Sequence, residues 1–409
     1  MTQRSSRIGS FRPGAAGLAA LALLLGAAGC AESKTGAFGT APTSQALETT
    51  TTTAARVPDA VVSIDPPLGS DQFAPMTPVT VTAGNGTLSD VVVSDSDGVD
   101  LSGAMSADGM LWQATELLEY DTTYSVVATA VNPSGKATTA SGSITTVRPR
   151  TFTEASITPF GDMTTVGVGM PIIVQFDEDI EDRAAVESRL TVTTTPPVVG
   201  SWYWFSDREV HYRPQEYWVP GTHVVFDVGI YGVNVGDNIY GAENRHMEFD
   251  IDDAMVAKVD NSDLRMRVYR NGVLQREMPV SMGKPGTLTP SGTMVVMQQH
   301  RYYTMDSSTY GVPIDDPDGY RLEVEYASRI TYSGIFVHAA PWSVGDQGSR
   351  NVSHGCINVS TANAQYFYEN FGWGDIVQVT GTGRGLEPTN GFGDWNIPWE
   401  QWLLGSALS

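Results

Sequence analysis

At roughly 100–200 residues per domain, a chain of 409 residues is expected to form more than one domain, each able to bury its own core. Acidic residues outnumber basic residues by 46 to 24, which gives a formal net charge of −22. No nucleic acid partner is expected, because binding a phosphate backbone requires clustered Lys and Arg. Two cysteines, Cys30 and Cys356, are too few for a small disulfide-stapled scaffold, so each needs its own explanation.

Residues 1–30 have the three parts of an export signal: a basic start, an apolar run and small residues ahead of Cys30. The apolar run is too short to span ~30 Å of hydrocarbon comfortably, which favours a cleaved signal over a membrane helix. Ala27-Ala28-Gly29-Cys30 resembles a bacterial lipobox, in which the cysteine is lipidated; plain secretion is the alternative. We expect a lipoprotein signal peptide over 1–29 and a lipidated Cys30 with a Thr/Ala-rich tether over 30–57. The protein is then exported and lipid-anchored to the outer face of the plasma membrane.

Two segments, 58–149 and 150–252, are predicted to form Ig-like β-sandwich domains. Short apolar runs of period two, such as 91–93 and 124–130, alternate with turn pairs such as Asn85-Gly86. Regular short strands separated by such turns are typical of all-β sandwiches. The second segment repeats this scheme, and residues 178–190 are predicted to add a short helix.

An aromatic run over 202–205 could form a ligand platform. We favour the simpler interpretation, in which alternate members fill the core and the others face a neighbouring domain. The three histidines of this segment lack metal-ligand spacing and are interpreted as structural: His211, His223 and His246.

The pattern changes near residue 253, and a third, β-rich domain is predicted over 253–381. Arg270-Asn271-Gly272 between two apolar runs indicates a hairpin. A short helix is predicted over 360–370, with Ser360 as N-cap and Ala362, Ala364, Phe367 and Tyr368 on its buried side. The segment 382–409 carries three tryptophans and is predicted to pack back onto the folded body. The fold class is therefore mainly β.

The chemistry is concentrated around His338 and the run Ser353-His354-Gly355-Cys356. An adjacent histidine can lower the pKa of a cysteine thiol and take its proton. His338 suits this role, because a neighbouring strand would bring it across the thiol, whereas His354 is too close in the chain. The backbone amides of Gly355 and Cys356 are natural oxyanion donors. Two alternatives stay open: a zinc site at His338, His354 and Cys356, and a buried structural cysteine.

His338 followed by Ser353-His354-Gly355-Cys356-Ile357-Asn358 resembles the signature of the L,D-transpeptidase (YkuD) family. The Trp-rich tail, the lipobox and the surrounding runs 305–311, 319–321 and 332–334 resemble its mycobacterial and actinobacterial lipoprotein branch. The resemblance implies two Ig-like domains, then a YkuD catalytic domain with a Trp-rich C-terminal extension.

The resemblance also implies roles for individual residues. Cys356 is the nucleophile, His338 is the general base and acid, and the backbone carbonyl of Ala339 orients the His338 ring. His354, Gly355 and Cys356 supply the oxyanion site. The positions that match substrate contacts, the pocket wall or the lid are Tyr320, Ser333, Gly334, Asn358, Trp342, Met305 and Tyr310.

The implied activity is the cross-linking of peptidoglycan stem tetrapeptides, donor and acceptor, in the cell wall. A Cys356 thioester forms with release of D-Ala, and the amine of another stem resolves it into a 3→3 link between diaminopimelate residues. Water in place of that amine would give an L,D-carboxypeptidase side activity. Carbapenems are implied inhibitors, and no metal or cofactor is implied. The alternatives are a surface-anchored adhesion protein with an inactive catalytic domain and, less well matched, a zinc amidase.

Overall fold

The computed structural model describes residues 56–161, 163–317 and 319–409. The signal peptide, Cys30 and all but the end of the predicted tether lie outside these residues. Strands dominate the described chain, which confirms the mainly β fold class. In the described part no helix is both long and apolar enough to cross a membrane.

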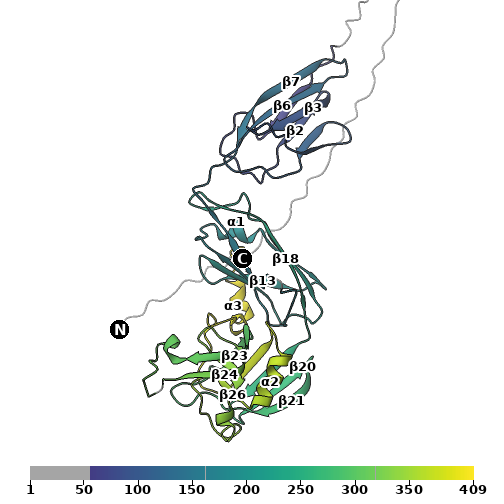
Figure 1. Ribbon diagram of the computed structural model, residues 1–409. Coiled ribbons are helices and arrows are strands. Elements are labelled where there is room, and N and C mark those ends of the chain that lie inside the picture. The colour runs from purple at the N-terminus through teal and green to yellow at the C-terminus, as the bar shows by residue number, and fades with distance from the viewer. Residues whose placement is uncertain (1–55, 162, 318) are drawn as a thin grey trace, which may run out of the picture. The chain divides into compact units, whose positions relative to one another are not determined.

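The first sandwich consists of two antiparallel sheets (Figure 1). One has the order β1-β2-β5-β4, with the strands β1 (Val61–Asp65), β2 (Thr80–Gly84), β5 (Leu111–Ala114) and β4 (Gly103–Met105). The other has the order β3-β6-β7, with the strands β3 (Thr87–Ser94), β6 (Thr123–Val131) and β7 (Ala137–Thr145). Along β6 the side chains of Tyr124, Val126 and Ala128 are buried between neighbours that are exposed or half-exposed. This is the alternation expected of a strand with one face on a core.

The second sandwich has two larger sheets and a three-stranded one (Figure 1). The first sheet contains β10 (Thr165–Val166), β18 (Arg245–Ile251), β15 (His223–Val228) and β12 (Leu190–Thr195). The second contains β13 (Gly200–Trp204), β14 (Glu209–Pro214), β11 (Ile172–Phe176) and β9 (Ala155–Thr158). The third contains β16 (Asn234–Gly236), β17 (Ile239–Gly241) and β8 (Thr151–Thr153). The predicted short helix is α1 (Arg183–Glu187), which is shorter than the expected span and is capped by Asp182.

The third domain also has two sheets. The first has the strands β21 (Val273–Pro279), β20 (Arg265–Arg270), β19 (Met255–Asp260), β27 (Ile376–Thr380) and β22 (Gly292–Val295). The second has the strands β23 (Gln298–Asp306), β24 (Arg321–Arg329), β25 (Phe336–Ala339) and β26 (Ile357–Val359). Between these strands lie the 3-10 turns η1 (Ser307–Tyr310) and η2 (Pro341–Ser343). The predicted hairpin is confirmed, because β20 pairs with β21 and Asn271 and Gly272 both have positive φ.

The helix α2 (Thr361–Asn370) packs against β24 and β25. Ser360 is its N-cap, as predicted, and its hydroxyl accepts a hydrogen bond from the Asn363 amide. The predicted buried side is only partly right. Ala364 and Phe367 are buried, Tyr368 is half-buried, and Ala362 is exposed. Ala362 stands two positions before Ala364, which turns it about 200° away at 3.6 residues per turn.

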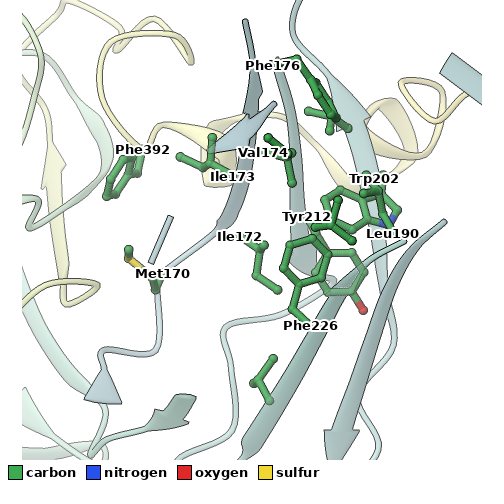
Figure 2. Packing of buried hydrophobic residues seen from close by; sticks show 14 of the residues in the cluster. Met170, Ile172, Ile173, Val174, Phe176, Leu190, Trp202, Tyr212, Phe226 and Phe392 are labelled. Atoms are coloured by element: carbon green, nitrogen blue, oxygen red, sulfur yellow. The ribbon is translucent and has the colours of Figure 1, made fainter. Parts of the chain in front are cut away.

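The aromatic run fills the core of the second sandwich with alternate members. Trp202 and Trp204 are buried, and Figure 2 shows Trp202 beside Tyr212 and Phe226. Tyr203 and Phe205 lie on the opposite face and contact the ring of Trp402, at centroid distances of 5.0 and 6.1 Å. The prediction that alternate members fill the core is therefore confirmed, whereas the other members face the C-terminal segment rather than a neighbouring domain.

The C-terminal segment folds back onto the second sandwich through η3 (Asp394–Asn396) and α3 (Trp399–Leu403). Trp402 is fully buried, and its indole donates to the Ser201 carbonyl at 2.9 Å. The guanidinium of Arg213 lies between three indole rings, with centroids 4.5–5.2 Å away: Trp395, Trp399 and Trp402. Cation–π contacts of this kind fix the segment at β13 and β14.

The second sandwich and the third domain share one hydrophobic core. The buried cluster that contains Ile172 and Phe226 also contains Val295, Met297 and Ile376 of the third domain. Phe392 of the C-terminal segment belongs to it as well and is labelled in Figure 2. Backbone hydrogen bonds cross the same boundary, from Gly167 N to Trp373 O and from Gly169 N to Gly374 O, both 2.7 Å.

Candidate active site

Two neighbouring parallel strands bring the key residues together. In the β25–β26 pair, His338 lies opposite Asn358, and Cys356 directly precedes β26. Side chains alternate along a strand, so Cys356 and Asn358 share a face, and His338 points to the same side. All three line one cavity of about 160 Å³.

The cavity brings together most of the predicted site. Its lining residues are Met305, Tyr320, Leu322, His338, Trp342, Val352, Ser353, His354, Cys356 and Asn358. Within the described part of the chain this lining contains no Asp, Glu, Lys or Arg. The lining is mainly apolar, includes the half-exposed indole of Trp342 and carries a few polar groups, as is usual for ligand sites.

The imidazole of His338 is buried and oriented by the main chain. Its Nδ1 donates to the Ala339 carbonyl at 2.9 Å, as the resemblance implies, which leaves Nε2 as the basic nitrogen. Burial lowers the pKa of His338 to about 4, although its bonds to the Ala339 carbonyl and to Asn358 oppose this shift. The ring is therefore neutral at pH 7, with Nε2 unprotonated.

The thiol of Cys356 is also neutral at rest. It donates to the Gly334 carbonyl at 3.7 Å. Burial raises the pKa of Cys356 to about 11, against the opposing effects of the Phe336 amide and the Arg329 charge. The expectation that a neighbouring histidine lowers this pKa is therefore wrong for the resting site. Since His338 is itself buried and uncharged, it offers the thiol a base rather than a positive charge.

The turn that presents the thiol depends on Gly355. Its φ is +129°, in the left-handed region that favours glycine. The hydroxyl of Ser353 holds this turn, because it donates to the Cys356 carbonyl at 2.7 Å and accepts from the Gly355 amide at 3.1 Å. The Gly355 amide, which the sequence predicts as an oxyanion donor, therefore already has a hydrogen-bond acceptor within the turn.

The remaining predicted residues do not all line the cavity. His354 is exposed, and its ring contacts that of Tyr320 at 5.0 Å. Ser333 and Gly334 do not line the cavity, and Gly334 reaches it only through the carbonyl that accepts from Cys356. The side chain of Tyr310 lies outside the described residues.

Two lining residues were missed from the sequence, Leu322 and Val352, and a third, Ser353, was placed in the motif but given no role of its own. Leu322 could have been found, because it follows Tyr320 by two positions at the start of β24 and so shares its face. No sequence signal indicates that the Ser353 hydroxyl would hold the turn.

The described residues offer no arrangement of three or more His, Cys, Asp or Glu side chains suited to a metal ion. The zinc alternative therefore gains no support from these residues, whereas the Cys356 thiol and the His338 imidazole line the same cavity. A buried thiol, a neutral base oriented by a carbonyl and a cavity between them suit nucleophilic acyl transfer.

Both parts of the described chain resemble known proteins. A model described as a bacterial Ig domain matches residues 70–234, and one described as an L,D-transpeptidase catalytic domain matches residues 254–379. L,D-transpeptidase 2 of Mycobacterium tuberculosis is 45% identical over 331 residues, 81% of this chain and 81% of that protein. L,D-transpeptidase 5 of the same species is 38% identical over 342 residues, 82% of this chain and 74% of that protein. A solved structure of the L,D-transpeptidase LdtMt1 in complex with imipenem is 37% identical and covers 55% of this chain and 98% of that chain, with a TM-score of 0.49. With its Ig-like and catalytic domains, the chain belongs to the L,D-transpeptidase family and is an acyltransferase.

Proposed function

We propose that this L,D-transpeptidase forms 3→3 cross-links between diaminopimelate residues of peptidoglycan stems, through a thioester on Cys356. The observation that carries the proposal is the pairing of the Cys356 thiol with the carbonyl-oriented imidazole of His338 in one cavity. A thiol with a base at hand forms acyl-enzymes readily, and no metal or cofactor is required.

The first half-reaction is acylation. His338 Nε2 takes the thiol proton as sulfur attacks the carbonyl of the third stem residue, diaminopimelate. The C–N bond to D-Ala then breaks, and His338 returns the proton to the departing amine. The negative oxygen of the intermediate is stabilised by the Cys356 amide and by His354, because the Gly355 amide is held by Ser353.

The second half-reaction transfers the acyl group. The side-chain amine of another stem's diaminopimelate attacks the thioester, the new amide forms, and the C–S bond breaks. His338 takes the proton of the attacking amine and returns it to sulfur. Water in place of the amine would release a free tripeptide, which is the carboxypeptidase side reaction.

Substrate contacts follow from the cavity lining. Tyr320, Met305 and Trp342 form the walls that hold the donor stem, and Asn358 lies beside the imidazole. Ser333, Gly334 and Tyr310 are proposed to contact the stem outside the cavity. Carbapenems fit the same slot as acyl donors, and we propose that they acylate Cys356.

The place of action is the cell wall. Residues 1–29 are proposed to be a lipoprotein signal peptide, and the lipidated Cys30 anchors the mature protein to the outer face of the plasma membrane. The tether that follows would let the catalytic domain reach peptidoglycan.

The test uses the mature chain, residues 30–409, with Cys30→Ser so that Cys356 is the remaining thiol. Intact-protein mass spectrometry after incubation with a carbapenem should show a single adduct of drug mass, absent from a Cys356→Ala control. Incubation with stem tetrapeptides should then release D-Ala and yield 3→3 dimers. A folded protein that forms neither adduct nor dimers would contradict the proposal and favour the adhesion alternative.

A further inference from the structure

A tight turn between β24 and β25 presents the carbonyl that accepts the hydrogen bond of the nucleophile. The turn comprises residues 331–334 and is closed by the Gly334 amide, which donates to the Thr331 carbonyl at 3.3 Å. Gly334 has a φ of +85°, a conformation that glycine adopts readily, so the direction of its carbonyl depends on contacts that hold the turn in this form. That carbonyl accepts from the Cys356 thiol at 3.7 Å.

The outer side of this turn is held by a residue of the C-terminal segment. Asn390 Oδ1 accepts from the Ser333 amide at 2.8 Å, and Asn390 Nδ2 donates to the Ser333 hydroxyl at 2.9 Å. The Ser333 hydroxyl also lies 3.2 Å from that of Thr331, which in turn accepts from the Ile335 amide at 3.0 Å. The side chain of Asn390 is thus linked through Ser333 and Thr331 to the Ile335 amide, by a series of hydrogen bonds that runs along the turn.

The position of Asn390 is itself fixed by its neighbours. Gly391 follows with a φ of +100°, and a Cβ there would stand 3.1 Å from the Thr331 Cα, so the segment lies directly against the turn. Phe392 is buried in the shared core and meets the ring of Tyr332 edge-on at 6.4 Å. The hydrogen bonds of Asn390 therefore join the turn to a rigid support.

We propose that Asn390 is a positioning residue for the reaction: it fixes the turn at Ser333-Gly334 so that the Gly334 carbonyl holds the Cys356 thiol in place in the cavity. The inference rests on the proposed function, in which Cys356 is the nucleophile. Asn390 does not line the cavity, so it acts through the turn rather than by touching the reacting atoms.

The test compares Asn390→Ala with the parent protein, the mature chain carrying Cys30→Ser. In this variant the Gly334 carbonyl is no longer held in place. Acylation by a carbapenem should then slow about tenfold or more, because a reaction is much slower when its reacting groups are misplaced. The pKa of the Cys356 thiol should also fall in this variant, because the hydrogen bond to the Gly334 carbonyl, which stabilises the neutral thiol, is lost. The midpoint of iodoacetamide alkylation against pH should therefore move down, by about half a unit to one unit.

Two further variants separate positioning from general destabilisation. Asn390→Asp keeps an acceptor for the Ser333 amide and one for its hydroxyl, so it should restore most of the acylation rate and bring the midpoint back up. Asn396→Ala is the matched control. Asn396 lies in the same C-terminal segment as Asn390, but it bonds to the backbone N–H and C=O of Thr293 instead of the turn. This control should lower the melting temperature while leaving the acylation rate and the alkylation midpoint unchanged.

Unchanged rate and midpoint in Asn390→Ala, or equal changes in Asn396→Ala, would overturn the inference. Alkylation needs no peptide substrate, so its midpoint decides the role of Asn390 independently of cross-linking. A parent protein that makes no 3→3 dimers, yet differs from Asn390→Ala in its midpoint, would refute the proposed function and leave the positioning role standing.

Discussion

At pH 7 the reactive side chains are both neutral, because burial raises the pKa of Cys356 to about 11 and lowers that of His338 to about 4. Between about pH 4 and about pH 11 the main form of the site therefore has a protonated Cys356 thiol and an unprotonated His338 imidazole. We expect the rate constant of carbapenem acylation to be level from about pH 9 down to about pH 5 and to fall as His338 is protonated near pH 4.

Stopped-flow acylation across this range would check the profile, with Trp fluorescence as the control for folding. The control is needed because the folded pKa of His338 lies below its unfolded value of about 6.5, so its contribution to stability is lost as pH falls from 6.5 toward 4. A loss of rate centred near pH 6.5 in folded protein would mean that the imidazole is not buried as described.

Replacing His338 should show whether it acts as the base, as distinct from controlling the access of reagents to Cys356. His338→Gln keeps a polar side chain of similar reach but removes the proton acceptor, and acylation by a carbapenem should fall by about 10²–10⁴. Alkylation of Cys356 by iodoacetamide at high pH should persist, because hydroxide then ionises the thiol. A variant that acylates at the parental rate would contradict the role of His338.

The sequence predicts the reacting pair but not its surroundings. His338 and Cys356 stand out because their residue types and a nearby glycine match acyl-transfer chemistry. The bond between the Gly355 amide and the Ser353 hydroxyl, and the support of Ser333 by Asn390, are tertiary contacts. Neither leaves a periodic or motif signal, and the neutral resting state depends on burial that only packing determines.

At the scale of elements, a buried ion pair joins β14 to the C-terminal segment. His211 Nδ1 donates to Asp394 at 2.6 Å, and both side chains are buried. Desolvation opposes the charged form, but Asp394 and Glu209 together raise the pKa of His211 to about 9. The sequence suggested only a structural role for this histidine, because its partner lies far along the chain.

Removing one partner of this pair should be costly. Asp394→Ala would leave the His211 charge buried without its main partner, and we expect a loss of about 3–5 kcal/mol in the free energy of unfolding. Denaturant unfolding of the parent and the variant would measure it. Glu248→Ala, which removes a carboxylate beside the exposed His246, is the matched control and should leave the unfolding midpoint nearly unchanged.

The pair also predicts a direction for the pH dependence. The folded pKa of His211 is raised above its unfolded value of about 6.5, so its stabilising contribution is complete below pH 6.5 and is lost as pH rises toward 9. This part of the stability profile should become smaller in Asp394→Ala, in which only Glu209 still raises the pKa of His211. An unaltered profile would show that the pair does not titrate as described.

At the scale of the whole molecule, the second sandwich belongs to the catalytic unit. The sequence predicts the strands and the change of character near residue 253, because both depend on local patterns. It does not reveal that Val295, Met297 and Ile376 complete the core of the preceding domain. Contacts between segments far apart in sequence decide that, and they are absent from any local pattern.

This shared core makes a prediction about truncation. Cutting the chain at residue 253 would expose these three side chains and Phe392, each worth about 1.5–3 kcal/mol when fully buried. Domain stabilities are only about 5–15 kcal/mol, so residues 253–409 alone should aggregate or unfold without cooperativity. Residues 150–409, which retain the second sandwich, should unfold cooperatively and still form a carbapenem adduct at Cys356. Calorimetry would measure the unfolding of the two fragments, and mass spectrometry would detect the adduct. A stable 253–409 fragment that forms the adduct would show that the catalytic domain does not depend on the second sandwich.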